Sequence, residues 1–98
     1  MLKKTYSEAD GPCQVTFELP PEVNAQSACL CGEFNEWSQA SHPMQRREDL
    51  RFALTLSLQR DRQYRFRYLL DGERWENDWA ADAYVTNPFG SEDSVVQL

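Results

Sequence analysis

Two tryptophans and one arginine have the residue types and spacing that could carry a binding chemistry. Trp37 ends the stretch CGEFNEW at residues 31–37, which is typical of a turn after a strand. Trp75 follows an Asp-Gly turn, and Arg67 lies on the strand-like run before that turn. An indole face matches the apolar C–H patch of a sugar ring, and guanidinium and carboxamide groups can pair with its hydroxyl groups. Together with a polar loop, these three residues would suffice to bind a neutral glucan.

The same three residues have two other interpretations. Trp and Arg are frequent anchors of protein interfaces, so the set would also serve a protein partner. A tryptophan of a β-sandwich is often a core residue. For Trp37 and Trp75, a core role and a binding role fit the pattern about equally well. For Trp79, a core role fits better than a binding role. Arg67 alone would be a solvated strand residue. The pattern by itself leaves the choice open.

Enzymatic chemistry has little support in the sequence. Glycoside hydrolysis needs two carboxylates across a cleft, but Asp78 and Asp82 lie where a strand-like run ends and are typical of turn and surface acids. A nucleophile needs an oriented base, and the single histidine, His42, lies in the turn-like SHPM. The sequence also lacks glycine-rich phosphate loops and acidic calcium loops. We expect no catalytic residue and no cofactor.

The cysteines and the start of the chain indicate the class of protein. Cys13, Cys29 and Cys31 are an odd number, which does not suit a disulfide framework. Cys29 and Cys31 would lie side by side on one strand face, yet zinc needs four ligands and His42 is the one histidine. We expect no metal site and three reduced thiols in a cytoplasmic protein. The opening MLKKTYSEAD lacks the apolar run of a secretory signal, and no segment approaches the roughly 20 apolar residues of a membrane span.

Charge is unevenly distributed along the chain, whose formal net charge is −6. Residues 46–67 contain seven arginines against three acids, whereas residues 73–98 contain six acids against one arginine. Nucleic-acid affinity depends mainly on a clustered basic surface, so the acidic chain predicts a neutral ligand or a protein partner and no nucleic acid. The uneven charge is most simply explained by solvated strand faces that pair across a sheet.

Alternation of apolar and polar residues is the main structural signal. It predicts half-buried antiparallel strands at residues 13–19, 26–32, 50–58, 63–70, 73–79 and 91–98. On the third of these, Leu50, Phe52, Leu54, Leu56 and Leu58 would share one face. The Asp71-Gly72 pair predicts a hairpin between two strands. Short strands with frequent turn signals predict a single-domain, all-β, antiparallel β-sandwich over residues 13–98, after a loosely attached N-terminal lead, residues 1–12.

Several motifs in order resemble a known family. The strings LCGEFNEWS and HPM, followed by YRFRYLLDGERWENDWAADAYVTNPFGSEDSVV, are similar to the family 48 carbohydrate-binding modules of isoamylases, glycogen branching enzymes and the AMP-activated protein kinase β subunit. The resemblance covers about residues 13–98 and implies an immunoglobulin-like, early-set β-sandwich that holds α-1,4-linked glucan on one face. It implies a glucan-binding set at Trp37, Arg67, Trp75, Phe89, Ser91 and Asp93.

Two functional hypotheses are consistent with this resemblance. The first is a stand-alone, non-catalytic module that binds glycogen, starch or maltooligosaccharides. The second is a protein-interaction or regulatory module on the same scaffold, whose partner would be a glycogen-metabolising enzyme or a second copy of the chain. Asp93 motivates the second hypothesis, because the family has asparagine there and a carboxylate removes a donor and adds charge. The acidic C-terminal third and the end of the chain at Leu98, with no enzyme domain attached, also support it.

Overall fold

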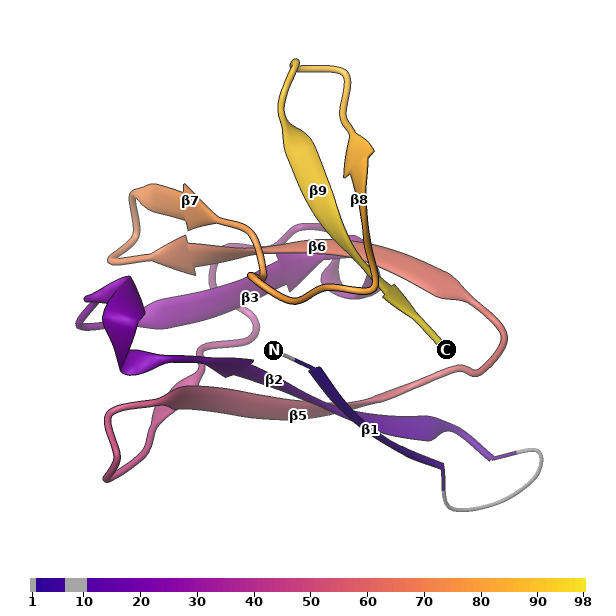
Figure 1. The fold of residues 1–98 in the computed structure, drawn as a ribbon, viewed down its shortest axis with the longest axis horizontal. Helices are drawn as coiled ribbons and strands as arrows, with labels where there is room; N and C mark the ends of the chain where they lie inside the picture. The colour runs from indigo at the N-terminus through magenta and orange to yellow at the C-terminus, as the bar shows by residue number, and fades with distance from the viewer. Residues whose placement is uncertain (1, 7–10) are drawn as a thin grey trace.

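The computed structural model describes residues 2–6 and 11–98, and it shows two antiparallel sheets that face each other (Figure 1). The first sheet has the order β1-β2-β5-β4: β1 (Leu2–Tyr6), β2 (Cys13–Leu19), β5 (Phe52–Leu58) and β4 (Gln45–Arg46). The second has the order β3-β6-β9-β8, with β7 paired to β6: β3 (Ala28–Gly32), β6 (Gln63–Leu70), β9 (Glu92–Gln97), β8 (Ala83–Thr86) and β7 (Arg74–Glu76). The predicted all-β antiparallel sandwich is confirmed.

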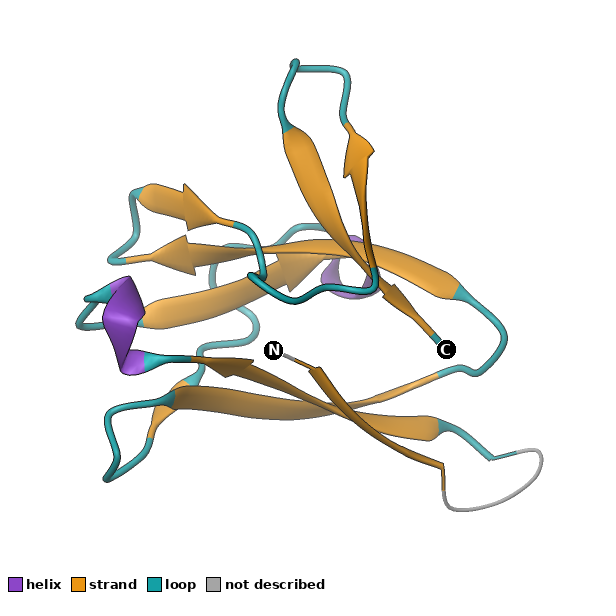
Figure 2. Ribbon diagram, viewed as in Figure 1, coloured by secondary structure: helices purple, strands orange, loops and turns teal. Residues whose placement is uncertain are grey.

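Helical structure in the described part of the chain consists of two single 3₁₀ turns, η1 (Pro21–Val23) and η2 (Glu33–Asn35) (Figure 2). Neither is long enough to cross a membrane. Since η2 follows β3 directly, it belongs to the turn that carries the CGEFNEW stretch.

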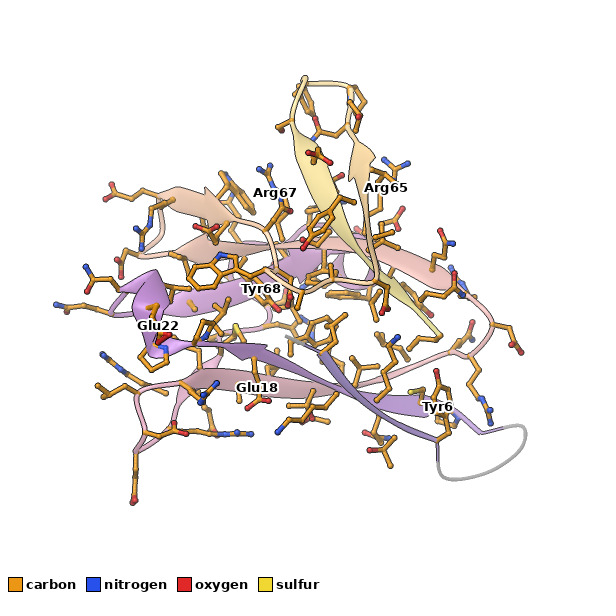
Figure 3. All side chains as sticks on the ribbon, in the orientation of Figure 1. Tyr6, Glu18, Glu22, Arg65, Arg67 and Tyr68 are labelled. Carbon is orange, nitrogen blue, oxygen red and sulfur yellow. The ribbon has the colours of Figure 1, made fainter. Side chains whose placement is uncertain are left out.

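The core lies between the two sheets and is built from the apolar positions of the alternating strands. Phe17 of β2, Leu30 of β3 and Phe66 of β6 are fully buried in one cluster. The rings of Phe17 and Phe66 meet edge to face, with centroids 5.1 Å apart and an interplanar angle of 76°, which is a favoured aromatic geometry. Because side chains alternate along a strand, Arg65 and Arg67 of β6 point to the outer face of the second sheet (Figure 3).

The strand predicted over residues 50–58 is shorter than expected. It begins at Phe52, and Leu50 is 52% exposed with a φ of 69°. A tight turn forms there, because the Leu50 N–H donates to the Arg47 carbonyl (2.9 Å) and the Arg47 N–H donates to the Arg51 carbonyl (2.7 Å). The prediction that Leu50 shares the buried face of this strand is therefore wrong.

The N-terminal lead predicted over residues 1–12 contains a strand. Leu2–Tyr6 forms β1, which pairs with β2 from Leu2 opposite Phe17 to Tyr6 opposite Cys13. Lys4 also reaches the other sheet, where its Nζ lies 2.7 Å from Oδ2 of Asp82. Residues 2–6 are therefore part of the sandwich and not a loosely attached lead, whereas residues 1 and 7–10 of that prediction lie outside the described residues.

The Asp71-Gly72 hairpin is confirmed, although its return strand is short. Asp71 and Gly72 have φ values of 53° and 72°, which is the left-handed conformation that such turns need. The strand predicted over residues 73–79 ends at Glu76, and Trp79 is 54% exposed on the following connection. Within the hairpin, Trp75 lies directly opposite Leu69 in the strand register.

Candidate functional site

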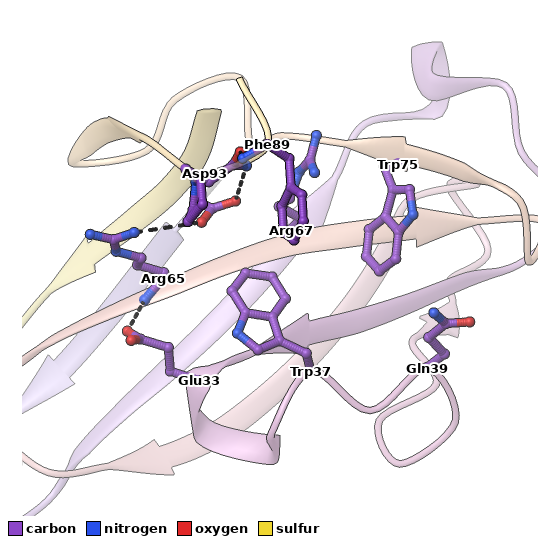
Figure 4. A pocket seen from close by; sticks show the side chains of 10 residues that line it. Glu33, Trp37, Gln39, Arg65, Arg67, Trp75, Phe89 and Asp93 are labelled. Atoms are coloured by element: carbon purple, nitrogen blue, oxygen red, sulfur yellow. Dashed lines mark hydrogen bonds and ion pairs between the residues drawn. The ribbon is translucent and has the colours of Figure 1, made fainter. Parts of the chain in front are cut away.

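A groove of about 480 Å³ lies on the outer face of the second sheet (Figure 4). Its volume falls within the roughly 300–1,000 Å³ of ligand sites. It is lined by Glu33, Trp37 and Gln39 from the segment after β3, by Arg65, Arg67 and Trp75 from β6 and β7, and by Asn87, Pro88, Phe89 and Asp93 from the β8–β9 hairpin. Segments far apart in the sequence thus bring five of the six predicted site residues into one groove. The sixth, Ser91, does not line it.

Trp37 is held in the groove by a constrained turn. Glu36 and Trp37 both have left-handed backbone angles, with φ values of 56° and 58°, and a bulky residue in this region carries strain of about 1–3 kcal/mol. The Trp37 N–H donates to the Gly32 carbonyl at 2.8 Å, which closes the turn. The strain is therefore offset by surrounding contacts that fix the position of the indole.

Asn35 and Gly32 make this turn possible. The Asn35 Oδ1 accepts the Gly32 N–H at 3.0 Å, and its Nδ2 donates to the Leu30 carbonyl at 3.0 Å. A Cβ atom at Gly32 would lie 2.6 Å from the Arg65 carbonyl oxygen and 2.8 Å from the Phe34 ring. Only glycine fits between β6 and the Phe34 side chain. Gly32, Phe34 and Asn35 therefore shape the turn that presents Trp37.

A small apolar cluster supports Trp37 from below. Cys29, Cys31 and Leu69 are buried on the outer side of the second sheet, and the half-buried Trp37 packs against them. Burial, with the neighbouring Cys29, raises the pKa of the Cys31 thiol to about 12, so it stays a neutral apolar group at physiological pH. Trp37 is thus neither a core residue nor a free one, because one side is packed and the other borders the groove.

Trp75 and Arg67 form the next part of the groove. Trp75 is 39% exposed, and the Cζ of Arg67 lies 5.7 Å from the centroid of its ring, within the range of a cation–π contact. The Nε of Arg67 is buried and has no hydrogen-bond partner among the described residues. No carboxylate in that part of the chain forms an ion pair with Arg67 either. The Nη groups, which likewise have no partner among the described residues, therefore keep hydrogen-bonding capacity for a ligand in the groove.

The β8–β9 hairpin carries Phe89 to the rim of the groove, where the side chain is 92% exposed. Asn87 holds this loop. Its Oδ1 accepts the backbone N–H of Phe89 (3.0 Å) and of Ser91 (3.2 Å), and its Nδ2 donates to the Ser91 Oγ (2.9 Å) and to Oδ1 of Asp93 (3.1 Å). The Ser91 hydroxyl is therefore engaged within the loop, and Ser91 does not line the groove.

Asp93 lies at the base of the groove and is 6% exposed. Asn87 donates to one of its carboxylate oxygens, and Nη1 of Arg65 lies 4.0 Å from the other. Glu33, on the opposite rim, accepts the backbone N–H of Arg65 at 2.7 Å. Two acids and two arginines therefore line the groove, and their formal charges cancel.

Sequence reasoning assigned no role to Asn87, Arg65 or Glu33. Arg65 carried a usable signal, because it lies two residues from Arg67 on the same strand face. Asn87 had only the general signal of Asn-Pro at a turn, and its bonds to Asp93 and Ser91 depend on the hairpin being closed. Glu33 had no signal, since its partner is a backbone N–H of another strand.

Neither carboxylate considered for hydrolysis lines the groove. Asp78 is buried and accepts the Tyr68 hydroxyl at 2.7 Å, and burial together with this carboxylate raises the pKa of Tyr68 well above its usual value. Asp82 pairs with Lys4 and accepts the Gln97 N–H. Both side chains therefore fasten the connection after β7 to the sandwich. In the described residues, no group of three or more His, Cys, Asp or Glu side chains is placed to hold a metal ion.

Comparison with protein families identifies the group to which this scaffold belongs. Residues 8–85 match the model of carbohydrate-binding module 48, the isoamylase N-terminal domain. A search of curated proteins found no significant match. The match spans most of the chain, so the chain belongs to the carbohydrate-binding module 48 family, and the expected early-set, immunoglobulin-like fold is confirmed. Phe89 and Asp93 lie beyond the matched segment.

Proposed function

We propose that this module is non-catalytic and binds α-1,4-linked glucans such as glycogen, starch or maltooligosaccharides in the groove between η2 and the β8–β9 hairpin. The observation that carries the proposal is that Trp37 and Trp75 line one groove with Arg67 beside them. Membership of a carbohydrate-binding family supports a sugar as the ligand.

The chemistry of the groove suits a neutral polyhydroxylated ligand. The two indoles offer apolar surface for the C–H patches of sugar rings, and Phe89 adds apolar surface at the opposite rim. The two Nη groups of Arg67, which have no hydrogen-bond partner in the described residues, can bind ring hydroxyls with paired hydrogen bonds. Because the formal charges lining the groove cancel, an anionic or cationic ligand gains no net Coulomb attraction there, which leaves a neutral ligand the better fit.

Tryptophan fluorescence during titration with maltoheptaose tests the proposal, with Trp37→Ala and Trp75→Ala as the variants. Each should weaken binding by about tenfold, because a nucleic-acid base stacked on an aromatic side chain is worth about 1–3 kcal/mol and we expect a comparable loss for a sugar ring. Trp79→Ala is the matched control, since Trp79 is exposed, bonds Glu76 and does not line the groove. An intact protein that neither binds maltoheptaose nor is retarded on a glycogen affinity gel would refute the proposal.

The alternative of a protein-interaction module has one specific observation in its favour. β8 is an edge strand of the second sheet, and its Ala83, Tyr84 and Thr86 are exposed, so its free edge could pair with another chain. Asp93 gives this alternative little support, because its carboxylate is buried beside Asn87 and Arg65 and is not presented to a partner. Light scattering tests self-association through β8, and a strict monomer would count against it.

A cytoplasmic location also remains a proposal, supported by three unpaired cysteines.

A further inference from the structure

A second hollow of about 190 Å³ lies next to the groove. Gln39 lines both, so the two depressions share a wall. The floor of the hollow includes Leu69, whose strand partners are Cys29 on one side and Trp75 on the other. The hollow therefore continues the same sheet face past Trp75, towards the Gly72 turn.

The position of Gln39 gives the direction of this continuation. In Figure 4, Glu33 and Arg65 lie at one end of the groove, and Gln39 and Trp75 lie at the other, with Trp37 between them. A linear ligand stacked on Trp37 and Trp75 would leave the groove at the Gln39 end. The next unit of such a ligand would meet the hollow.

The lining of the hollow suits an uncharged sugar ring. None of its lining side chains carries a charge. Ala40, Pro43 and Leu69 supply apolar surface. Ser27 and Gln39 also line the hollow, and their hydroxyl and carboxamide groups have no hydrogen-bond partner in the described part of the chain. At Gly72, nothing lies within 4 Å of the place a Cβ atom would take, so this side of the hollow is open.

We infer that the hollow is an extension of the glucan site, and that it binds the part of an α-1,4-glucan chain that runs out of the groove past Gln39. The inference rests on the proposed function. The hollow has less than half the volume of the groove, so it would hold roughly one further ring if the groove holds two or three. The module would then bind a long maltooligosaccharide more tightly than one that only fills the groove.

Isothermal titration with maltotriose and maltoheptaose tests the inference on the full chain. The test variant is Ala40→Leu, which fills the hollow with an uncharged side chain at an exposed position. The control is Ala80→Leu, the same change at an exposed position that lines neither depression. We expect the unmodified protein to bind maltoheptaose roughly fivefold or more tightly than maltotriose, the effect of about one added hydrogen-bonded contact.

Ala40→Leu should remove most of this preference and leave maltotriose affinity unchanged, and Ala80→Leu should change neither. The inference is overturned if Ala40→Leu keeps the full preference for maltoheptaose, or if the unmodified protein has no preference while Trp37→Ala still weakens binding. Those results leave the proposed function standing. Absence of binding to both ligands by the unmodified protein overturns the proposed function itself, and the inference with it.

Discussion

Arg67 and Trp75 lie against each other across β6 and β7, with the Cζ of Arg67 5.7 Å from the centroid of the Trp75 ring. The contact has two consequences for the groove. It restrains the Trp75 indole, which is 39% exposed and lies on a three-residue strand. It also keeps the Arg67 guanidinium at the groove, where that group has no acidic partner in the described residues. One arginine can therefore orient the platform and donate to the ligand.

Replacement of Arg67 should affect binding more than stability. Arg67→Met removes the cation–π contact and the donors, so we expect maltoheptaose affinity to fall roughly tenfold. Arg67→Lys keeps the charge but loses the planar fork of donors, so its affinity for maltoheptaose should lie between that of Arg67→Met and that of the unmodified protein. Calorimetric titration measures the effect. Arg62→Met is a matched control, because Arg62 lies over the Tyr64 ring at 5.1 Å and does not line the groove; an equal loss of affinity in this control would contradict the assignment.

Gly32 should be required for both the fold and the groove. The Cβ of Gly32→Ala would meet the backbone oxygen of Arg65 at 2.6 Å, and such overpacking costs about 1–3 kcal/mol of unfolding free energy, measurable in urea. Because the same contact positions the Trp37 turn, maltotriose binding should weaken as well.

Gly72→Ala separates the effect of a glycine substitution on stability from its effect on maltotriose binding. Gly72 has room for a Cβ atom but a φ of 72°, so this variant should lose about 1 kcal/mol of stability through backbone strain alone. Its maltotriose affinity should stay unchanged. If both glycine variants bound maltotriose normally, the role of Gly32 in placing Trp37 would be refuted.

Asn87 should matter through the loop that it holds. Asn87→Ala leaves the backbone N–H groups of Phe89 and Ser91 without their acceptor and removes one partner of Asp93. We expect a loss of about 1–2 kcal/mol in unfolding free energy. The affinity for maltoheptaose should fall as far as in Phe89→Ala, because both changes take the Phe89 ring away from the rim of the groove. Asn87→Asp keeps the acceptor for both N–H groups but places a second carboxylate beside Asp93, so it should preserve the loop less well than asparagine does. Full affinity in Asn87→Ala would show that the loop does not depend on this residue.

Much of the sandwich could be predicted from the sequence because its strands alternate strictly. The face shared by Phe66 and Tyr68 on β6 is buried, and the intervening Arg67 lies outside, as the two-residue period requires. The alternating pattern predicts the wrong structure where a local turn forms in place of a strand. At Leu50, a backbone hydrogen bond to Arg47 ends the pattern two residues before the strand begins.

Features that depend on contacts distant in the sequence could not be predicted. Leu2–Tyr6 forms a strand because the edge of β2 is free to pair with it, although two lysines give the segment a polar character. The groove could be predicted only in part, since Trp37, Arg67 and Trp75 follow from motif order. The partners of Asp93, which are Arg65 and Asn87, could not be predicted, because Arg65 comes near only through the pairing of β9 with β6 and Asn87 only through the closed β8–β9 hairpin.

Asp71 should make the stability of the domain depend on pH in the acid range. Its Oδ1 accepts the backbone N–H groups of Gln26 (2.8 Å) and Ser27 (3.0 Å), and these bonds lower the pKa of Asp71 below its usual value of 3.8. Because the folded state holds the ionised form, this stabilisation is fully present above the unfolded pKa and is lost as pH falls through the folded pKa.

Asp71→Asn provides the test, since asparagine tolerates the φ of 53° at this position and can still accept through its carbonyl oxygen. Urea unfolding from about pH 6 down to about pH 2 should show the unmodified protein more stable than Asp71→Asn at the upper end. The difference should shrink once the pH falls below about 4, as the Asp71 carboxylate becomes protonated. Parallel pH profiles for the two proteins would mean that these hydrogen bonds do not favour the ionised form. High salt serves as a further check, because backbone hydrogen bonds at the turn should persist when the weaker attraction of Arg74 is screened.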